Sequence, residues 1–470
     1  MSLSDDQELA LEKFKKGENL FITGPGGTGK TYLIKEIIKI CTDKFQVCAL
    51  TGCAAILLNC NAKTIHSWSG IKIANGEIKD IVERLVENKY LRKTWRSTKV
   101  LIIDEVSMMS KKIFELLNIL AKSMRNNTKP FGNMQIIFLG DFYQLPPVSK
   151  GYNKDEEQFC FESDEWFNVF PKQNNIILEK IFRQEDKEYI DLLMNIRKGI
   201  CTEENIKTLD KRKINNKDEI INAINIYPIK IKVNEVNEKN FNNLKEKEYI
   251  SNSEIVKDVT VYLHNDKAID SEHINAYRRA SPKQIDYEIN YLLNNCPCDN
   301  ILNIKKGARI MCIINLDMDN EICNGSQGEI EDIITKNNKI IAIKVKFDNG
   351  IVKNIVKNPW QSEIYPNIVL YQFPLILAWA ITVHKIQGAT LDKAIMDIGY
   401  TTFEYGQTYV ALSRIKSLEG VYLTNFNVSK IKANPTVLDF YKKIENNDNI
   451  RCEEKKNMIK SEEKVKIIKL

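Results

Sequence analysis

A glycine-rich segment is the first group of residues whose types and spacing could do chemistry. It runs GPGGTGKT between an apolar stretch, Asn19–Thr23, and a helical pattern, Lys30–Ile40. Glycines let a backbone curl so that its N–H groups face a phosphate, and the helix that follows adds a favourable dipole. This order of strand, loop and helix predicts a phosphate-binding loop. Its residues are Gly24, Pro25, Gly26, Gly27, Thr28, Gly29, Lys30 and Thr31.

Two adjacent carboxylates are the expected partners of this loop. Asp104 and Glu105 follow the apolar strand pattern Lys99–Ile103. Asp104 would hold Mg²⁺ together with Thr31, while Lys30 would reach the β- and γ-phosphates. Glu105 would orient and deprotonate the attacking water. Together, the loop and the carboxylates predict a nucleoside triphosphate hydrolase that uses Mg²⁺.

Two later motifs narrow this class. The run GDFYQLPPV, residues 140–148, follows the strand pattern Met134–Leu139 and places Gln144 where it could sense hydrolysis at the γ-phosphate. The run YVALSR places Arg414 at the end of a short helix. From a second domain, this arginine could stabilise transition-state charge on the γ-phosphate. A nucleotide kinase or another small-molecule enzyme would leave YVALSR and the preceding run TVHKIQGATL unexplained.

At these motifs the sequence resembles the petite-integration-frequency (PIF-type) DNA helicases of superfamily 1B, with the RecD-type helicases next. GPGGTGKT, IIDEVSMM, GDFYQLPPV, TVHKIQGATL and YVALSR occur in the family's order and spacing. The stretch Ser107–Gln135 is similar to a signature segment of the family, and the resemblance covers about residues 3–425. It implies two RecA-like domains with ATP between them, single-stranded DNA across their top, and 5′-to-3′ movement.

The resemblance also implies roles for individual residues. Gln7 matches an adenine-recognising glutamine, and Arg183 matches a second arginine aimed at the γ-phosphate. Gln387 and Gly388, in the run TVHKIQGATL, match positions that would contact the nucleotide. Trp68 could stack on a base or separate a duplex, or it could simply pack the inserted segment onto its parent domain. The positions matching DNA contacts are Thr51, Gly52, Thr64, His66, Ser67, Trp68, Thr382, His384 and Lys385.

The fold expected from these patterns is α/β. Alternating strand and helix patterns predict doubly wound parallel sheets, and the resemblance implies that these form two RecA-like domains. The alternating apolar residues and glycines of residues 301–360 predict a small β-barrel. The expected divisions are domain 1A at 1–62 and 99–175, an inserted wedge domain 1B at 63–98, domain 2A at 176–300 and 361–440, barrel domain 2B at 301–360, and a charged tail at 441–470.

Composition and charge fit this picture. The chain has 470 residues, 43% hydrophobic and 28% charged, which excludes general disorder and a fibre. The net charge is +6, but residues 51–150 alone sum to +7, which hints at a polyanion partner for this part of the surface. The cysteines form no CxxC pair, and the apolar stretch Pro374–Val383 is too short to span a bilayer. We expect a soluble, intracellular, DNA-associated protein with no membrane contact.

The sequence therefore predicts an ATP-dependent 5′-to-3′ DNA helicase that acts as a monomer on single-stranded and forked DNA. Replication, repair, recombination and telomere maintenance are the processes that the resemblance suggests. Two alternatives stay open. One is a translocase, stimulated by single-stranded DNA, that remodels protein–DNA complexes without separating strands. The other is a RecD-like subunit of a larger complex.

Overall fold

The computed structural model describes residues 3–58, 60, 62–71, 76–147, 158–214, 220, 223–263, 266–317, 319–362 and 364–445. Most of the predicted charged tail, from residue 446 onward, lies outside this described part, as does the last residue of GDFYQLPPV. Within the described residues, none of the helices has the length and apolar character needed to cross a membrane.

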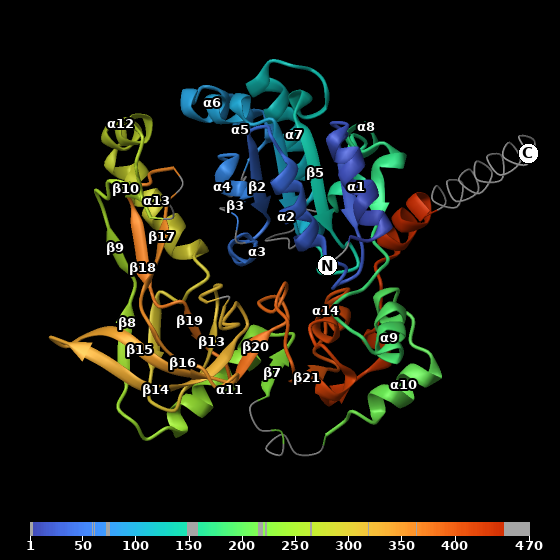
Figure 1. The fold of residues 1–470 in the computed structure, drawn as a ribbon, viewed down its shortest axis with the longest axis vertical. Helices are drawn as coiled ribbons and strands as arrows, with labels where there is room; N and C mark the ends of the chain where they lie inside the picture. Colours follow the sequence, from blue (N-terminus) through green and yellow to red (C-terminus); the bar gives the residue numbers. More distant parts are fainter. Residues whose placement is uncertain are drawn as a thin grey trace, which may run out of the picture.

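A six-stranded parallel sheet organises the first part of the chain (Figure 1). Its order is β3-β2-β4-β5-β1-β6, and the residues of β1 and β4 are buried throughout, as in strands covered on both faces. The strands are β1 (Leu20–Thr23), β2 (Phe45–Ala49), β3 (Lys63–Thr64), β4 (Val100–Asp104), β5 (Gln135–Gly140) and β6 (Asn175–Ile177). The helices are α1 (Asp5–Lys15), α2 (Lys30–Ile40), α3 (Gly52–Leu57), α4 (Ile65–Trp68), α5 (Ile78–Val86), α6 (Lys89–Ser97), α7 (Lys111–Arg125) and α8 (Trp166–Val169).

A second parallel sheet, of order β20-β7-β21-β22, lies in the lower part of Figure 1. All neighbouring strands of this sheet run parallel, although they come from segments that are far apart in the sequence. The strands are β7 (Ile224–Tyr227), β20 (Ala380–Thr382), β21 (Ala394–Ile398) and β22 (Val421–Phe426). The helices of this part are α9 (Lys187–Arg197), α10 (Glu203–Asp210), α11 (Lys230–Asn243) and α14 (Gln407–Ser413). The two parallel sheets confirm the predicted α/β class with two RecA-like units.

Antiparallel strands and two helices form the left side of Figure 1. The largest sheet has the order β16-β15-β14-β13-β19, and smaller sheets pair β17-β18-β9, β12-β8 and β10-β11. The strands are β8 (Tyr249–Asn252), β9 (Glu254–Val256), β10 (Val261–Tyr262), β11 (Lys267–Ala268), β12 (Ile301–Ile304), β13 (Arg309–Cys312), β14 (Gln327–Lys336), β15 (Lys339–Phe347), β16 (Val352–Ile355), β17 (Asn358–Gln361), β18 (Val369–Gln372) and β19 (Leu375–Leu377). The helices are α12 (Ser271–Arg279) and α13 (Pro282–Asn295).

The predicted domain boundaries stay a prediction, and strand pairing differs from them in three places. β3 lies at the predicted start of the inserted domain, yet it pairs with β2 in the first sheet. β6 lies at the predicted start of domain 2A, yet it pairs with β1. The antiparallel part extends beyond 301–360, because β18 pairs with β9 and β19 pairs with β13. The short strands β3, β6 and β19 thus each form backbone hydrogen bonds with a strand that lies outside their predicted domain.

The chain finally returns to the first sheet. Residues 435–445 are helical, and Phe440 packs in the aromatic core of the first unit with ring centroids 5.6 Å from Phe142 and 5.9 Å from Trp166. Tyr441 is 1% exposed. The predicted division placed residue 441 at the start of a charged tail, whereas residues 441–445 continue this helix. Burial of these aromatic rings stabilises the helix against the first unit.

Candidate functional site

The phosphate loop occupies the turn between β1 and α2. Gly27 has φ 90° and Gly29 has φ 78°, both in the left-handed region that favours glycine. A Cβ atom on Gly27 would lie 2.6 Å from the Cβ atom of Arg183, so the approach of this neighbouring segment also requires glycine. Because α2 begins at Lys30, the N–H groups of its first turn face the loop. This is the predicted phosphate-binding arrangement.

Lys30 lies at the centre of the loop. Its Nζ donates hydrogen bonds to the carbonyl oxygens of Gly24, at 2.6 Å, and Pro25, at 2.9 Å. Burial lowers the pKa of Lys30, while the nearby carboxylates of Asp141 and Glu105 oppose that shift. Thr28 supports the loop from within, since its Oγ1 donates to the Pro25 carbonyl at 2.9 Å. The ammonium group of Lys30 therefore lies among carbonyl and carboxylate oxygens.

The two predicted carboxylates lie at the end of β4. Asp104 is buried, and its Oδ1 accepts a hydrogen bond from the backbone N–H of Glu105 at 2.8 Å. Glu105 has φ 55°, a conformation that non-glycine residues rarely adopt and that is common at functional sites. Its Oε2 accepts a hydrogen bond from Nε2 of Gln387 at 3.1 Å. Burial, followed by the charge of Glu105, raises the pKa of Asp104 to about 7.

This pKa predicts a pH dependence of stability. The folded chain keeps a proton on Asp104 up to about pH 7, whereas the unfolded chain loses it near pH 4. Stability of the protein in EDTA should therefore fall as pH rises from about 4 to 7 and level off above that. Asp104→Asn should remove this slope and be more stable than wild type at pH 8, by on the order of 2–4 kcal/mol. Thermal unfolding midpoints of both proteins across this range measure the effect; parallel pH profiles would contradict it.

Two arginines approach the loop from the side of the second parallel sheet. Nη1 of Arg183 donates to the Ser413 carbonyl at 3.0 Å. Arg414 follows α14, is 2% exposed, and donates from Nη2 to Oγ of Ser413 at 3.1 Å. Burial, and then the charge of Arg414, lowers the pKa of Arg183 to about 9. Burial also lowers the pKa of Arg414. Two guanidinium groups held this close in a buried position favour an anionic ligand beside them.

A cavity of about 420 Å³ joins these groups. Residues of the first unit and of the second line it together, so a ligand there would contact both units. Phe182, Thr390 and Lys416 also line it, although sequence reasoning did not single them out. The predicted residues along its walls are Gly26, Gly27, Gly29, Lys30, Thr31, Asp104, Glu105, Gln144, Arg183, Gly388 and Arg414.

Three glutamines surround the cavity in different ways. Gln144 lines it, is 4% exposed, and has an Oε1 atom that finds no hydrogen-bond partner among the described residues. Gln387 reaches the site through its bond to Glu105. Gln7 is buried, and its Nε2 donates to the Thr28 carbonyl at 3.2 Å, so here it supports the phosphate loop. Its predicted contact with adenine stays a prediction.

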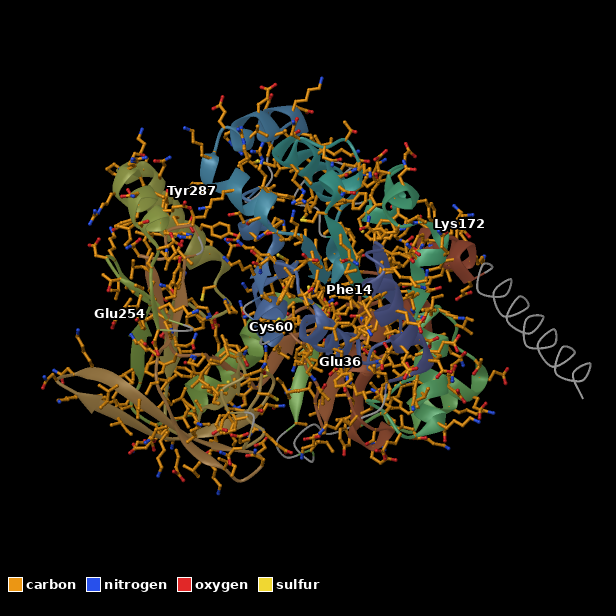
Figure 2. All side chains as sticks on the ribbon, turned by 45° about the horizontal axis from the view of Figure 1, so that its top comes forward. Phe14, Glu36, Cys60, Lys172, Glu254 and Tyr287 are labelled. Carbon is orange, nitrogen blue, oxygen red and sulfur yellow. The ribbon has the colours of Figure 1, made fainter. Side chains whose placement is uncertain are left out.

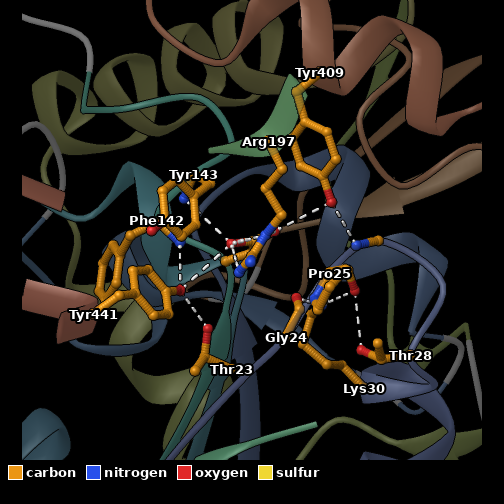
Figure 3. Close-up of polar contacts among 12 residues, drawn as sticks. Thr23, Gly24, Pro25, Thr28, Lys30, Phe142, Tyr143, Arg197, Tyr409 and Tyr441 are labelled. Carbon is orange, nitrogen blue, oxygen red and sulfur yellow. Dashed lines mark hydrogen bonds and ion pairs between the residues drawn. The ribbon is translucent and has the colours of Figure 1, made fainter. Parts of the chain in front are cut away.

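Behind the loop lies a polar cluster that sequence reasoning missed (Figure 3). Arg197, at the end of α9, forms a two-pronged ion pair with Asp141: Nη2 to Oδ1 is 2.8 Å and Nε to Oδ2 is 3.0 Å. Tyr409 and Tyr441 place their hydroxyls 3.4 Å from the same carboxylate. Asp141 and Tyr409 stand within the motifs GDFYQLPPV and YVALSR, but the sequence analysis gave a role in them only to Gln144 and Arg414. Nothing in the sequence connected Arg197 or Tyr441 with these motifs.

The ion pair carries a stability prediction. Asp141 is fully buried and Arg197 is 7% exposed. Arg197→Ala would leave the carboxylate buried without its cation and should destabilise the fold by about 3–5 kcal/mol, measured by denaturant unfolding. The double variant Asp141→Asn with Arg197→Met serves as control, because it removes both charges and should lose less. An equal loss in the two variants would contradict this account.

A second cavity, of about 370 Å³, lies between α3 and α4 of the first unit and α13 and β17 of the antiparallel part. Among the predicted DNA contacts, Gly52, Thr64 and Ser67 line it. Figure 2 labels Cys60, which lines it from the first unit, and Tyr287, which lies on α13 opposite. Residues on the antiparallel side that the sequence did not suggest include Tyr291, Asn358 and Trp360. The groove thus combines polar groups with aromatic rings, and bases of a single-stranded nucleic acid can stack on such rings.

Trp68 does not face this groove. It is 4% exposed, and its ring lies 4.6 Å from that of Trp95 on α6. The indole therefore packs the inserted helices onto the first unit, which was the alternative interpretation of this residue. The predicted stacking or strand-separating role of Trp68 is not supported by this position, because a stacking ring must have at least one face that a base can reach.

The remaining predicted DNA contacts are dispersed. Thr51 accepts a hydrogen bond from the N–H of Ala54 at 3.2 Å, and His66 is half-buried on α4. Thr382 ends β20, and His384 and Lys385 follow this strand; none of the three is among the residues lining the groove. Burial lowers the pKa of His384. The structure thus brings the nucleotide residues together, whereas it gathers only part of the predicted DNA contacts.

A basic surface lies on α6 above the groove. Lys89, Arg92, Lys93 and Arg96 line a shallow hollow there, which accounts for part of the positive charge of residues 51–150. Lys93 forms an ion pair with Glu272 of α12, so α6 touches the antiparallel part. Both side chains of this pair are exposed, and an exposed pair of this kind contributes little to stability.

Comparison with known proteins places these features in a family. A model of the PIF1-like helicase matches residues 2–207, and one of the DNA helicase Pif1 2B domain matches residues 289–333. The zebrafish protein ATP-dependent DNA helicase PIF1 is 33% identical, over 94% of this chain and 64% of its own. ATP-dependent DNA helicase RRM3 of Saccharomyces cerevisiae is 31% identical, over 94% of this chain and 68% of its own. The chain spans 57–64% of the length of the first four relatives compared.

Solved structures agree. The crystal structure of Pif1 helicase from Candida albicans is 32% identical with a TM-score of 0.74, covering 94% of this chain and 99% of its own. Bacteroides Pif1 in complex with ADP-AlF4 is 27% identical with a TM-score of 0.73, covering 96% and 98%. Bacteroides Pif1 bound to ssDNA is 28% identical with a TM-score of 0.63, covering 94% and 97%.

Proposed function

The chain belongs to the PIF1-like helicase family, and from this premise we propose that it is an ATP-dependent DNA helicase that moves 5′ to 3′ along single-stranded DNA and unwinds forked duplexes. One observation carries the proposal. The cavity that joins Lys30, Glu105 and Arg414 is built from both parallel-sheet units. A nucleotide that enters and leaves this cavity would therefore change how the two units contact each other. This change would also alter the shape of the groove.

ATP hydrolysis follows from the residues around the cavity. Lys30, Arg183 and Arg414 would neutralise the charge that spreads over the γ-phosphate in the transition state. Glu105 would take the proton of the attacking water, and Oε1 of Gln144 would orient that water by accepting its second hydrogen. The binding of ADP-AlF4 by Bacteroides Pif1 supports this assignment of the cavity.

Magnesium is the metal that we propose for this site. Thr31 and Asp104 line the same cavity and offer a hydroxyl and a carboxylate oxygen, the ligand type that Mg²⁺ prefers. The buried carboxylate is also more easily ionised beside a cation than alone. When bound, the metal would neutralise phosphate charge, while Lys30 and the two arginines hold the remaining oxygens.

Single-stranded DNA is the polymer that we propose for the groove. Bacteroides Pif1 binds ssDNA, and the groove of this chain offers hydroxyl groups for phosphate oxygens and aromatic rings for bases. Thr51, Thr382, His384 and Lys385 remain proposed contacts along the same path. Each round of hydrolysis would alternate which unit grips the strand more tightly.

The test is unwinding of forked duplexes that carry a single-stranded tail at the 5′ or the 3′ end, with and without ATP. We expect ATP-dependent unwinding of the substrate with a 5′ tail only, at a rate proportional to enzyme concentration if the monomer is active. ATP hydrolysis that single-stranded DNA does not stimulate would contradict the proposal.

The burial of Trp68 favours one alternative as the second candidate. Without an exposed wedge at this position, the chain could be a translocase that displaces bound proteins without separating strands. Displacement of streptavidin from biotinylated single-stranded DNA, in the absence of fork unwinding, would favour that function. A RecD-like subunit would require partner chains for either activity.

A further inference from the structure

The cluster behind the phosphate loop joins three parts of the chain. Asp141 follows β5 of the first unit, Arg197 ends α9 of the second, and Tyr441 belongs to the C-terminal helical segment. The Tyr441 hydroxyl lies 2.5 Å from Oγ1 of Thr23 and accepts a hydrogen bond from the N–H of Phe142 at 3.2 Å. The Arg197 guanidinium also lies 4.3 Å from the Tyr143 ring centroid. Asp141 is therefore held firmly in place.

Tyr409 connects this cluster to the phosphate loop. Its hydroxyl accepts a hydrogen bond from the backbone N–H of Gly26 at 2.9 Å and donates one to Oδ2 of Asp141 at 3.4 Å (Figure 3). The bond to the loop is thus the shorter of the two. Gly26 itself stands beside the two arginines, because a Cβ atom built on it would lie 3.4 Å from Nη1 of Arg183 and 3.5 Å from Nη2 of Arg414.

We propose that Tyr409 is a positioning residue that responds to the γ-phosphate: its hydroxyl holds the Gly26 N–H until the terminal phosphate of ATP takes that N–H, and the hydroxyl then bonds to Asp141 alone. This inference rests on the proposed ATP-binding function of the cavity. In this proposal Tyr409, a residue of the second unit, distinguishes a bound triphosphate from a diphosphate because its hydroxyl loses one hydrogen-bond partner only in the triphosphate state.

The exchange has a physical basis. Backbone N–H groups of a glycine-rich loop are the donors that bind phosphate oxygens, and one N–H cannot serve a phosphate oxygen and a hydroxyl at full strength. The hydroxyl loses little on release, because the Asp141 carboxylate already lies within reach and bonds to an ionised acceptor are the stronger kind. A diphosphate, which lacks the terminal group beside the arginines, would leave the Gly26–Tyr409 bond in place.

The exchange would act on the whole of α14. Tyr409 stands in the first turn of this helix and Arg414 directly follows its last residue. Tyr189 of α9 fixes α14 by donating from its hydroxyl to the Leu412 carbonyl at 2.7 Å. A change at Tyr409 is therefore transmitted along one short, fully buried helix to the arginine that faces the phosphate.

The test compares Tyr409→Phe with Tyr441→Phe in the full chain, without DNA. Both variants lose a hydroxyl that contacts Asp141, but only Tyr409 contacts the loop. We measure dissociation constants for ADP and for the non-hydrolysable triphosphate AMP-PNP by fluorescence titration. Tyr409→Phe should bind AMP-PNP about 3–10-fold more tightly, since no hydroxyl competes for the N–H, and bind ADP as wild type does. The ratio of the two constants should stay unchanged in Tyr441→Phe.

Steady-state kinetics give a second readout. Tyr409→Phe should lower the KM for ATP and also lower kcat, because the triphosphate state loses the bond that anchors α14 to Asp141. A purely structural defect would raise KM instead. An unchanged ratio of dissociation constants in Tyr409→Phe, or the same change in both variants, would overturn the inference.

A measurement on wild type covers the case in which the variant does not fold. Hydrogen exchange of residues 407–414 should differ between the AMP-PNP and ADP complexes, and identical exchange would overturn the inference. Failure of the proposed function is distinguishable: a wild-type chain that shows the nucleotide responses but unwinds no fork would refute the helicase proposal alone. Unwinding without any triphosphate-specific response would refute the role of Tyr409 alone.

Discussion

Glu105→Gln is expected to lower the kcat of DNA-stimulated ATP hydrolysis by about 10²–10⁴-fold, the usual contribution of a positioned general base. The amide keeps the size of the side chain but cannot take a proton from water. Glu105 lines the nucleotide cavity and is oriented by the hydrogen bond that its Oε2 accepts from Gln387. Because it acts on water and not on the nucleotide, the KM for ATP should change little.

Phosphate release at saturating single-stranded DNA measures this effect. Glu12→Gln is a matched control, since it makes the same chemical change on an exposed residue of α1 and should leave the rate unchanged. Fluorescent-nucleotide binding should show that Glu105→Gln still binds ATP. Wild-type turnover in this variant would exclude Glu105 as the base and would require another acceptor for the proton.

Arg414→Ala is expected to lower kcat by about 10³–10⁵-fold, the range found when an arginine that stabilises phosphoryl-transfer charge is lost. Its guanidinium is buried and is aimed by its own helix, since Nε donates to the Val410 carbonyl at 3.2 Å. Its Nη2 bonds to Ser413 and stands beside Gly26 of the phosphate loop. The charge is thus placed before the reaction begins, which is what makes it effective.

Single-turnover hydrolysis with pre-bound ATP separates this effect from nucleotide binding. Arg414→Lys should recover part of the rate, because an ammonium keeps the charge but lacks the planar fork. Arg84→Ala, which removes an exposed arginine of α5, should match wild type. A loss of less than tenfold in Arg414→Ala would show that the γ-phosphate charge is stabilised elsewhere, with Arg183 as the nearest candidate.

Local patterns predicted residues that the structure brings together around one cavity. A glycine-rich turn needs only its own backbone freedom and the helix that follows it, so the loop and the start of α2 at Lys30 could be read from adjacent residues. A buried parallel strand is an apolar run, so the carboxylates after β4 could also be placed. The family resemblance added Arg183 and Gln387, which lie far from the loop in sequence but reach the same site.

Contacts between distant segments were harder to predict. Whether Trp68 faces bases or packs on Trp95 depends on how α4 and α6 meet, which no local spacing determines. The short strands β3 and β6 carry too few residues to show which sheet they join. The bond between Tyr441 and Thr23 spans 418 positions. The charged residues around Tyr441 in the sequence therefore gave no sign that its side chain is buried.

The sequence by itself therefore determined the chemistry: a phosphate loop, two carboxylates, and the motif order of one helicase family. These depend on backbone conformation and residue type over a few neighbouring positions. Only the tertiary structure decided that Trp68 is buried, that residues 435–445 pack against the first unit, and that Arg197 and Tyr409 meet at Asp141. Those outcomes depend on the burial of apolar and paired charged groups across the whole chain, and burial is a property of the packed fold and not of any single segment.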